Sequence, residues 1–229
     1  MQRTLRHDRH PPRCHCEERE RDEAISSGRA SAQEHVRLIR VVPWKRCTSK
    51  DTPAGEETIK EKRDRAILST PLFHALRRDK PCKLKVKGFR HAQKGVPHLR
   101  VSRKGGKARY LPLHPATNAL IHDYLEAAGH GTDENGALFH PVRNNRTGRL
   151  EKAITADGVY KLVRAYSAQL GFEIGAHALR ATAATNALDH EADIAKVQEW
   201  LGHANIATTR IYDHRRTRPE DSPTFKVSY

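Results

Sequence analysis

The amino-acid sequence predicts a mainly α-helical domain with a small three-stranded antiparallel sheet. From about residue 57 onward, apolar residues recur with the three- and four-residue spacing of packed helices. Between residues 83 and 113 this spacing gives way to short runs in which apolar and polar residues alternate, as they do in half-buried strands. Helices on both sides of a compact group of strands favour a helical domain that carries one small sheet.

The three strands are predicted at residues 83–87, 98–102 and 108–113. The segment R-K-G-G-K separates the second strand from the third, and its paired glycines suit a tight hairpin. We therefore expect the three strands to pair in one antiparallel sheet.

Helices are predicted before and after this sheet. Residues 61–68 form the first helix, and a second segment carries Leu72 and Leu76. Pro71 falls inside what should be the helix before Arg77, where a proline typically costs about 3 kcal/mol or more. Residues 130–150 have the composition of a loop. Five later helices are expected. The first runs from around Pro115 to Gly129, and the second carries Val159, Leu162, Val163, Tyr166 and Leu170 and stops at Gly171. The third surrounds His177, the fourth carries Ile194, Val197 and Leu201 with Gly202 as a left-handed cap, and the fifth is a short stretch capped by Asn205.

The charge of the chain predicts a polyanionic partner. The formal net charge is +15 over 229 residues, and lysine and arginine release counterions when they neutralise phosphates. No apolar run approaches the roughly 18 residues that span a bilayer, and the N-terminus lacks the apolar stretch of a signal peptide. We expect a cytoplasmic protein that binds nucleic acid and no membrane.

The cysteines predict neither a disulfide framework nor a standard zinc module. The four cysteines of the chain are few and irregularly spaced. Cys14, His15 and Cys16, with His10 nearby, are the alternative candidates for a metal site. We expect no metal and no cofactor.

Three segments differ in composition. Residues 1–55 are rich in charges and prolines without sustained apolar periodicity, so little of this segment is expected to be ordered. Its run C-E-E-R-E-R-D-E-A-I-S is similar to a translated repetitive element of bacterial genomes, which favours a fusion scar. Residues 56–216 are expected to form one domain, and residues 217–229 a tail in which Phe225, Val227 and Tyr229 alternate with polar residues like a short edge strand.

Four polar residues in the last third of the chain have a distinctive order. His177 and Arg180 are three residues apart and project from one helix face. The tripeptide L-G-H places His203 at a sharp corner, and Tyr212 follows nine residues later. This arrangement, H-x-x-R, then L-G-H, then a tyrosine, resembles the catalytic core of the tyrosine recombinase, or phage integrase, family.

The resemblance implies DNA breaking and rejoining through a 3′-phosphotyrosyl bond. Tyr212 is the implied nucleophile, and His177, Arg180 and His203 are implied to surround the scissile phosphate. A phenol has a pKa near 10 and needs its proton removed as it attacks. Cationic donors must also hold the negative charge that builds on the phosphate oxygens, and a planar guanidinium suits this role. No metal is required, because the phosphate bond is exchanged and not hydrolysed.

The resemblance implies two further site residues. The family carries an arginine in a motif close to G-L-R-x-S-E-L, which matches A-L-R-R-D-K-P here and assigns phosphate binding to Arg77. Lys80 and Pro81 depart from this motif, at positions where the family has glutamate and leucine. A lysine in the family's β-hairpin acts as general acid on the departing 5′-oxygen; Lys104 matches it, and Lys107 is the competing candidate.

The predicted function is site-specific recombination or integration of double-stranded DNA, as in mobile elements. The alternative is a catalytically impaired DNA-binding remnant of a truncated integrase, because residues 1–55 are too short and too polar for the family's N-terminal core-binding domain. A type IB topoisomerase is a more distant alternative. In the family the tail beyond the nucleophile often docks on a neighbouring protomer, which implies that the tail here helps to assemble a multimer on DNA.

Overall fold

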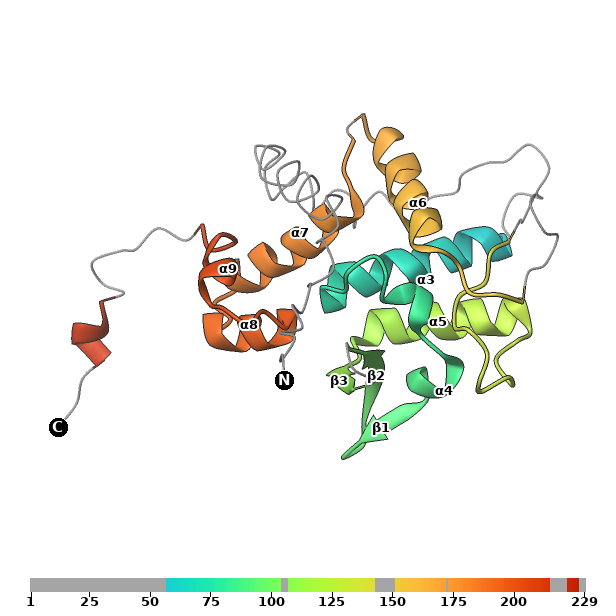
Figure 1. The fold of residues 1–229 in the computed structure, drawn as a ribbon, viewed down its shortest axis with the longest axis horizontal. Helices are drawn as coiled ribbons and strands as arrows, with labels where there is room; N and C mark the ends of the chain where they lie inside the picture. The colour runs from blue at the N-terminus through green and yellow to red at the C-terminus, as the bar shows by residue number, and fades with distance from the viewer. Residues whose placement is uncertain (1–56, 104–106, 143–150, 172, 215–221, 227–229) are drawn as a thin grey trace, which may run out of the picture.

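The structure is a computed structural model, and it describes residues 57–103, 107–142, 151–171, 173–214 and 222–226 (Figure 1). The predicted N-terminal segment 1–55 therefore lies outside the described residues. The mainly helical fold with one three-stranded antiparallel sheet is confirmed. The elements are, in chain order, α3 (Ile59–His74), η1 (Pro81–Lys83), α4 (Val86–Phe89), β1 (His91–Gln93), β2 (Val96–Ser102), β3 (Ala108–Pro112), α5 (Pro115–Ala128), α6 (Ala156–Ala168), α7 (Ala176–Asp189), α8 (Ile194–Leu201), α9 (Ala207–Arg210) and η4 (Pro223–Lys226).

Helix α3 runs through Pro71, where two separate segments were expected. It begins with a capping box in which Thr58 Oγ1 accepts from the amide of Glu61 and the Glu61 carboxylate accepts from the amide of Thr58. Pro71 has no amide hydrogen to donate to the carbonyl of Ile67. The hydroxyl of Thr70 donates to that carbonyl instead, at 2.8 Å. The local replacement of the lost donor lets the helix continue to His74.

The sheet has the order β1-β2-β3, and both pairings are antiparallel. The strands predicted at 98–102 and 108–113 correspond to β2 and β3. The strand predicted at 83–87 is wrong: residues there form η1 and the start of α4, with one isolated bridge between Lys85 and Ala137. Leu84 and Val86 are both buried. The alternation of apolar and polar residues therefore predicted their burial correctly, although these residues do not pair with a neighbouring strand.

The first strand of the sheet is instead β1, which a two-residue turn joins to β2. Lys94 and Gly95 in this turn have φ angles of 51° and 78°. Positive φ at both central residues is the geometry of a type I′ hairpin, which matches the twist of paired strands. The dipeptide Lys-Gly was the sequence signal for this hairpin.

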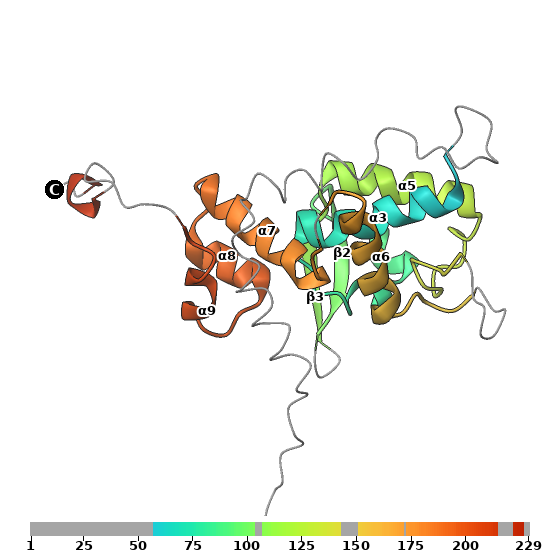
Figure 2. The same cartoon turned by 90° about the horizontal axis from the view of Figure 1, so that it is seen from above.

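The buried residues form two clusters. The larger lies among α3, α4, the sheet, α5, α6 and the start of α7, and the smaller lies between the end of α7 and α8. Figures 1 and 2 both show α8 and α9 toward one end of the molecule, away from α5 and α6, with α7 running from that end toward α3. Trp200 packs against both clusters. Because the start of α7 lies in the larger cluster and its end in the smaller one, α7 joins the two parts of the core.

The later helices follow the sequence expectations closely. Helix α5 ends at Gly129 and α8 at Gly202, both in the left-handed conformation, with φ angles of 69° and 71°. Asn205 Oδ1 accepts from the amide of Ala207, as predicted for the start of α9. Helix α6 ends at Ala168, before the predicted Leu170.

The described part of the C-terminal tail is not a strand. Phe225 lies in the 3₁₀ helix η4, which corrects the predicted edge strand; Val227 and Tyr229 lie outside the described residues. The amide of Thr224 donates to the Ser222 hydroxyl and that of Phe225 to the Ser222 carbonyl, which starts a helical turn. In the part of the chain that the structure describes, no helix is both long and apolar enough to cross a membrane.

Candidate active site

Arg180 lies at the junction of the two clusters and is buried, with 3% of its surface exposed. Its Nη1 donates to the carbonyl of Ala75, and its Nη2 donates to the carbonyl of Leu201 at 2.6 Å and to Nε2 of His203 at 3.1 Å. Its Nε is buried without a hydrogen-bond partner among the described residues. Burial, and then the charge of Arg77, lower the pKa of Arg180 to about 10, so it stays charged at neutral pH.

His203 follows Gly202, whose left-handed conformation ends α8 and turns the chain back toward α7. Its Nδ1 lies 3.0 Å from the hydroxyl oxygen of Thr209. Burial, and then the charges of Arg180, Arg77 and His177, lower the pKa of His203 to about 4. The ring is therefore neutral at pH 7.

Tyr212 lies just beyond α9, half-buried against the smaller cluster. The centroids of the Tyr212 and His203 rings are 6.2 Å apart, and the ring planes are inclined by 27°. The amide of Tyr212 donates to the carbonyl of Thr209 at 3.1 Å. Tyr212 raises the pKa of Arg180, which also places the phenol near the guanidinium.

Arg77 is exposed and follows the left-handed C-cap of α3. Ala75, with φ of 49°, turns the chain so that its carbonyl accepts from Arg180, and Leu76 is buried in the larger cluster. The charge of Arg77 lowers the pKa values of both Arg180 and His203. The turn at Ala75 thus brings Arg77 into the group.

The structure brings five of the predicted site residues together. His177 is half-buried in the first turns of α7 and lowers the pKa of His203, so it belongs to the same group as Arg77, Arg180, His203 and Tyr212. Lys104, the sixth predicted residue, lies outside the described residues. The competing candidate, Lys107, is exposed and directly precedes β3.

Arg109 is a member of the group that the sequence reasoning missed. It projects from β3 and donates from Nη1 to the carbonyl of Glu199 at 3.1 Å and from Nη2 to that of Trp200 at 2.5 Å. These carbonyls belong to the last turn of α8, where a cation is favoured by the helix dipole. The available signal was its phase: Arg109 is two and four residues before Leu111 and Leu113, so it shares the face of these two buried residues.

The group has an excess of positive charge. Among the described residues, Arg77, Arg109 and Arg180 take part in no ion pair with a carboxylate. Burial lowers the pKa values of Arg109 and Arg180 most, the charge of Arg77 lowers both further, and Glu199 is the carboxylate that raises the pKa of Arg109. A cationic group beside a phenol, with one buried donor left unpaired, is suited to receive an anion such as a phosphate. No group of metal-ligating side chains occurs in the described ranges.

Comparison with known proteins decides the family. The phage integrase family matches residues 51–218. The chain belongs to this family. Curated relatives include tyrosine recombinase XerC of Pelobacter propionicus, 37% identical over 164 residues, and XerC of Pseudomonas putida, 30% identical over 191 residues.

The coverage of these integrase-family relatives is partial. The two alignments span 72% and 82% of this chain but 51% and 60% of the relatives. A crystal structure of the XerH site-specific recombinase bound to palindromic difH substrate, in a post-cleavage complex, matches with a TM-score of 0.61 and 26% identity, over 80% of this chain and 48% of that one. The chain thus spans about half the length of the proteins that it resembles.

The departures from the integrase motif around Arg77 are accommodated locally. Lys80 pairs with the neighbouring Asp79 at 3.3 Å, and Pro81 opens η1, where its missing amide hydrogen costs nothing. Ala75 stands where the motif has glycine and holds a left-handed conformation that costs a non-glycine residue roughly 1–2 kcal/mol. Its buried methyl group packs in the smaller cluster and offsets part of that cost.

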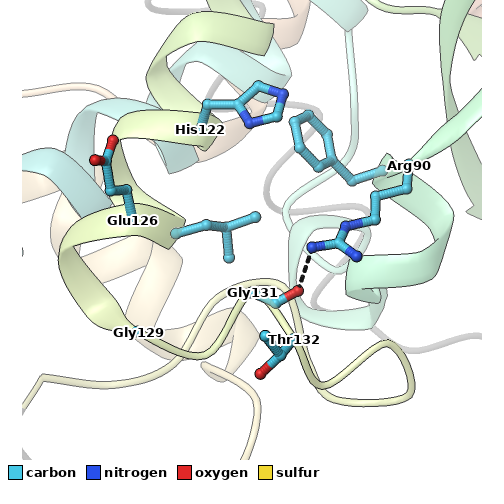
Figure 3. Close-up of a pocket in the computed structure, with 8 residues that line it drawn as sticks. Arg90, His122, Glu126, Gly129, Gly131 and Thr132 are labelled. Carbon is cyan, nitrogen blue, oxygen red and sulfur yellow. Dashed lines mark hydrogen bonds between the residues drawn. The ribbon is translucent and has the colours of Figure 1, made fainter.

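A hollow with a volume of about 350 Å³ lies beside α4 and α5 (Figure 3). Arg90 borders it and donates to the carbonyl of Gly131 at 2.6 Å. None of the predicted integrase site residues lines this hollow, so it is separate from the candidate active site. Its lining is Phe89, Arg90, His122, Leu125, Glu126, Gly129, Gly131 and Thr132.

Proposed function

We propose that this chain catalyses site-specific recombination or integration of double-stranded DNA by transesterification. The observation that carries the proposal is the convergence of Arg180, Arg77 and His203 beside the phenol of Tyr212. Membership of the phage integrase family supports the same reaction. We assign this reaction to a catalytic domain of residues 56–216.

In the proposed reaction, Tyr212 Oη attacks the scissile phosphorus and forms a 3′-phosphotyrosyl bond, while the bond to the 5′-oxygen breaks. The phenolic proton passes to solvent as the attack proceeds, and the Lys104 ammonium donates a proton to the departing 5′-oxygen. Rejoining reverses these steps with a new 5′-hydroxyl. The number of phosphodiester bonds is unchanged, so neither hydrolysis nor a metal ion is needed.

Each side chain around the phenol of Tyr212 has a proposed role that follows from its surroundings. Arg180 stays charged and has a buried Nε without a partner among the described residues, which suits it to bind a non-bridging phosphate oxygen. Arg77 is exposed, so it can meet the phosphate from the solvent side of the group. His203 is neutral, so it acts by hydrogen bonding at Nε2 and not by charge. His177 completes the group from α7.

The proposed partners are double-stranded DNA and further copies of this chain. The XerH structure that resembles this chain holds DNA, and the charge of +15 favours the same partner here. We assign assembly of the multimer to the tail 217–229, because Phe225 is 73% exposed in η4 and offers an apolar anchor. Deletion of residues 217–229 is expected to weaken self-association on DNA; unchanged sedimentation of the protein–DNA complex would contradict this. We expect the protein to act in the cytoplasm.

The test of the catalytic proposal is capture of the covalent adduct. A pool of duplexes with randomised sequence and a nick lets the short 5′-hydroxyl fragment diffuse away, so that the phosphotyrosyl adduct accumulates and is seen on a denaturing gel. Tyr212→Phe should abolish the adduct while leaving the fold and DNA affinity nearly intact. Tyr110→Phe, at an exposed tyrosine of β3, is the matched control and should retain it. An adduct that persists in the Tyr212→Phe variant would remove Tyr212 from its role.

A further inference from the structure

Thr209 lies in α9 and is fully buried, whereas its neighbour Thr208 is exposed. A buried hydroxyl must be hydrogen-bonded or it destabilises the fold. The hydroxyl oxygen of Thr209 lies 3.0 Å from Nδ1 of His203. Thr209 therefore contacts the ring whose other nitrogen faces Arg180.

The contact with Arg180 decides which ring nitrogen carries the hydrogen. A guanidinium has only donors, so Nε2 of His203 must supply the lone pair of the 3.1 Å hydrogen bond. A neutral imidazole has one N–H, which must then be at Nδ1. It follows that Nδ1–H donates and that the Thr209 oxygen accepts.

Thr209 is also linked to Tyr212. The amide of Tyr212 donates to the Thr209 carbonyl at 3.1 Å, so one residue holds both the His203 ring and the turn that carries the phenol. The centroids of the two rings are 6.2 Å apart. Any displacement of Thr209 would move the ring and the phenol together.

We propose that Thr209 is a positioning residue: its hydroxyl accepts the Nδ1–H hydrogen that Arg180 dictates, holds the orientation of the His203 ring and couples this ring to the Tyr212 turn. With Nδ1 occupied by its own hydrogen and by Thr209, Nε2 carries only a lone pair, which accepts from Arg180 and is the site that can take up a transferred proton. The tautomer is a property of the protein alone. The effect on catalysis rests on the function proposed above.

The tautomer is tested without DNA. In protein labelled with ¹⁵N at histidine, long-range ¹H–¹⁵N spectra at pH 7 distinguish Nδ1–H from Nε2–H, and the spectrum of His203→Gln identifies the His203 signals. The wild type and Thr209→Ser should show Nδ1–H. A wild-type Nε2–H tautomer would overturn the proposal whatever any variant does.

The coupling to catalysis is tested by Thr209→Val, which replaces the hydroxyl by a methyl group of similar size. The Nδ1–H signal of His203 should lose the shift that its hydrogen bond to Thr209 causes, and adduct formation at saturating DNA should slow about tenfold or more while DNA affinity stays the same. Thr209→Ser should restore both. If Thr209→Val keeps the wild-type Nδ1–H shift and rate, the proposal fails.

Two controls separate positioning from folding. Thr208→Val changes the exposed neighbour, and Thr182→Val removes a buried hydroxyl that donates to the carbonyl of Ala178 at 2.9 Å. Both should keep the His203 tautomer and the wild-type rate. If the wild type forms no adduct with any duplex but shows the Nδ1–H tautomer, the catalytic proposal fails and the assignment of the tautomer stands.

Discussion

Arg180 donates a 3.1 Å hydrogen bond to Nε2 of His203, so a permanently charged side chain faces a ring that must stay neutral. The pKa of Arg180 falls to about 10 and that of His203 to about 4, chiefly through burial. At neutral pH the pair therefore carries one positive charge. That charge and the ring meet where helices α7 and α8 and the turn after α3 come together.

Replacing Arg180 should impair both chemistry and stability. Arg180→Ala removes a donor that is assigned to the transition state, and losing such a donor typically costs on the order of 10²–10³ in rate. It also leaves the carbonyls of Ala75 and Leu201 without their donor, which we expect to cost about 2–4 kcal/mol of unfolding free energy. Adduct kinetics and urea unfolding measure the two effects.

Arg180→Lys separates the two contributions, because it retains the charge but not the planar fork. We expect it to recover part of the stability and little of the rate. Equal recovery of both would show that charge alone accounts for the role of Arg180.

Arg109 should stabilise the end of α8. It is the side chain that ties the carbonyls of Glu199 and Trp200 to β3. Arg109→Gln is expected to lower the free energy of unfolding by about 1.5–3 kcal/mol, the range for hydrogen bonds to charged groups. Arg100→Gln, at an exposed arginine of β2, removes the same charge and should change stability by less than about 0.5 kcal/mol. Equal effects of the two changes would refute the role of Arg109.

The sequence predicted most of the site because its members are polar residues at fixed separations on local elements. The separation of His177 and Arg180 is set within one helix, and Gly202 indicates the helix end and the turn before His203. Arg109 and Thr209 could not be found in this way. Their partners, the last turn of α8 and the ring of His203, lie across tertiary contacts that no local spacing encodes.

The difference between local spacing and tertiary contacts also explains the errors in the predicted fold. The alternation of Leu84 and Val86 indicated two buried residues but could not show whether a neighbouring strand was present to pair with them. Pro71 suggested a helix break because the replacement donor, the hydroxyl of Thr70, depends on a side-chain rotamer and not on residue type alone.

Thr70 and Pro71 should therefore be energetically coupled. Thr70→Val removes the hydroxyl that donates to the carbonyl of Ile67, which we expect to cost about 1–2 kcal/mol. Pro71→Ala supplies a backbone amide for the same carbonyl, so Thr70→Val should cost less in that background. A double-mutant cycle of urea unfolding measures the coupling; additive effects would contradict the compensation.

DNA binding by the chain should depend strongly on salt and should include a large component that is independent of sequence. The motivation is the net charge of +15. Each phosphate that is neutralised adds roughly 0.9 to the slope of log affinity against log salt concentration. Fluorescence anisotropy with unrelated duplexes over a range of salt concentrations gives the slope, and an affinity for these duplexes that does not change with salt would reject the prediction.

Acid should destabilise the fold through His74. This side chain is 1% exposed, and its Nε2 accepts from the amide of His114 at 3.0 Å, so it must be neutral in the folded protein. Burial, and then the charge of His114, lower the pKa of His74 from 6.5 to about 4. The unfolded chain binds a proton below pH 6.5 that the folded chain does not bind until about pH 4. The stabilisation is therefore complete above pH 6.5 and is lost as the pH falls through this window.

The size of this loss can be measured against a variant that does not titrate. Between pH 7.5 and pH 5 the shift in the pKa of His74 corresponds to about 2 kcal/mol of unfolding free energy. His74→Gln keeps an acceptor for the amide of His114, so it should lose about that much less stability than the wild type over the same interval. His203 titrates in the same direction in both proteins and cancels in the comparison. Urea unfolding at pH 7.5 and pH 5 decides the matter: parallel losses in the two proteins would show that His74 is not the group that binds the proton.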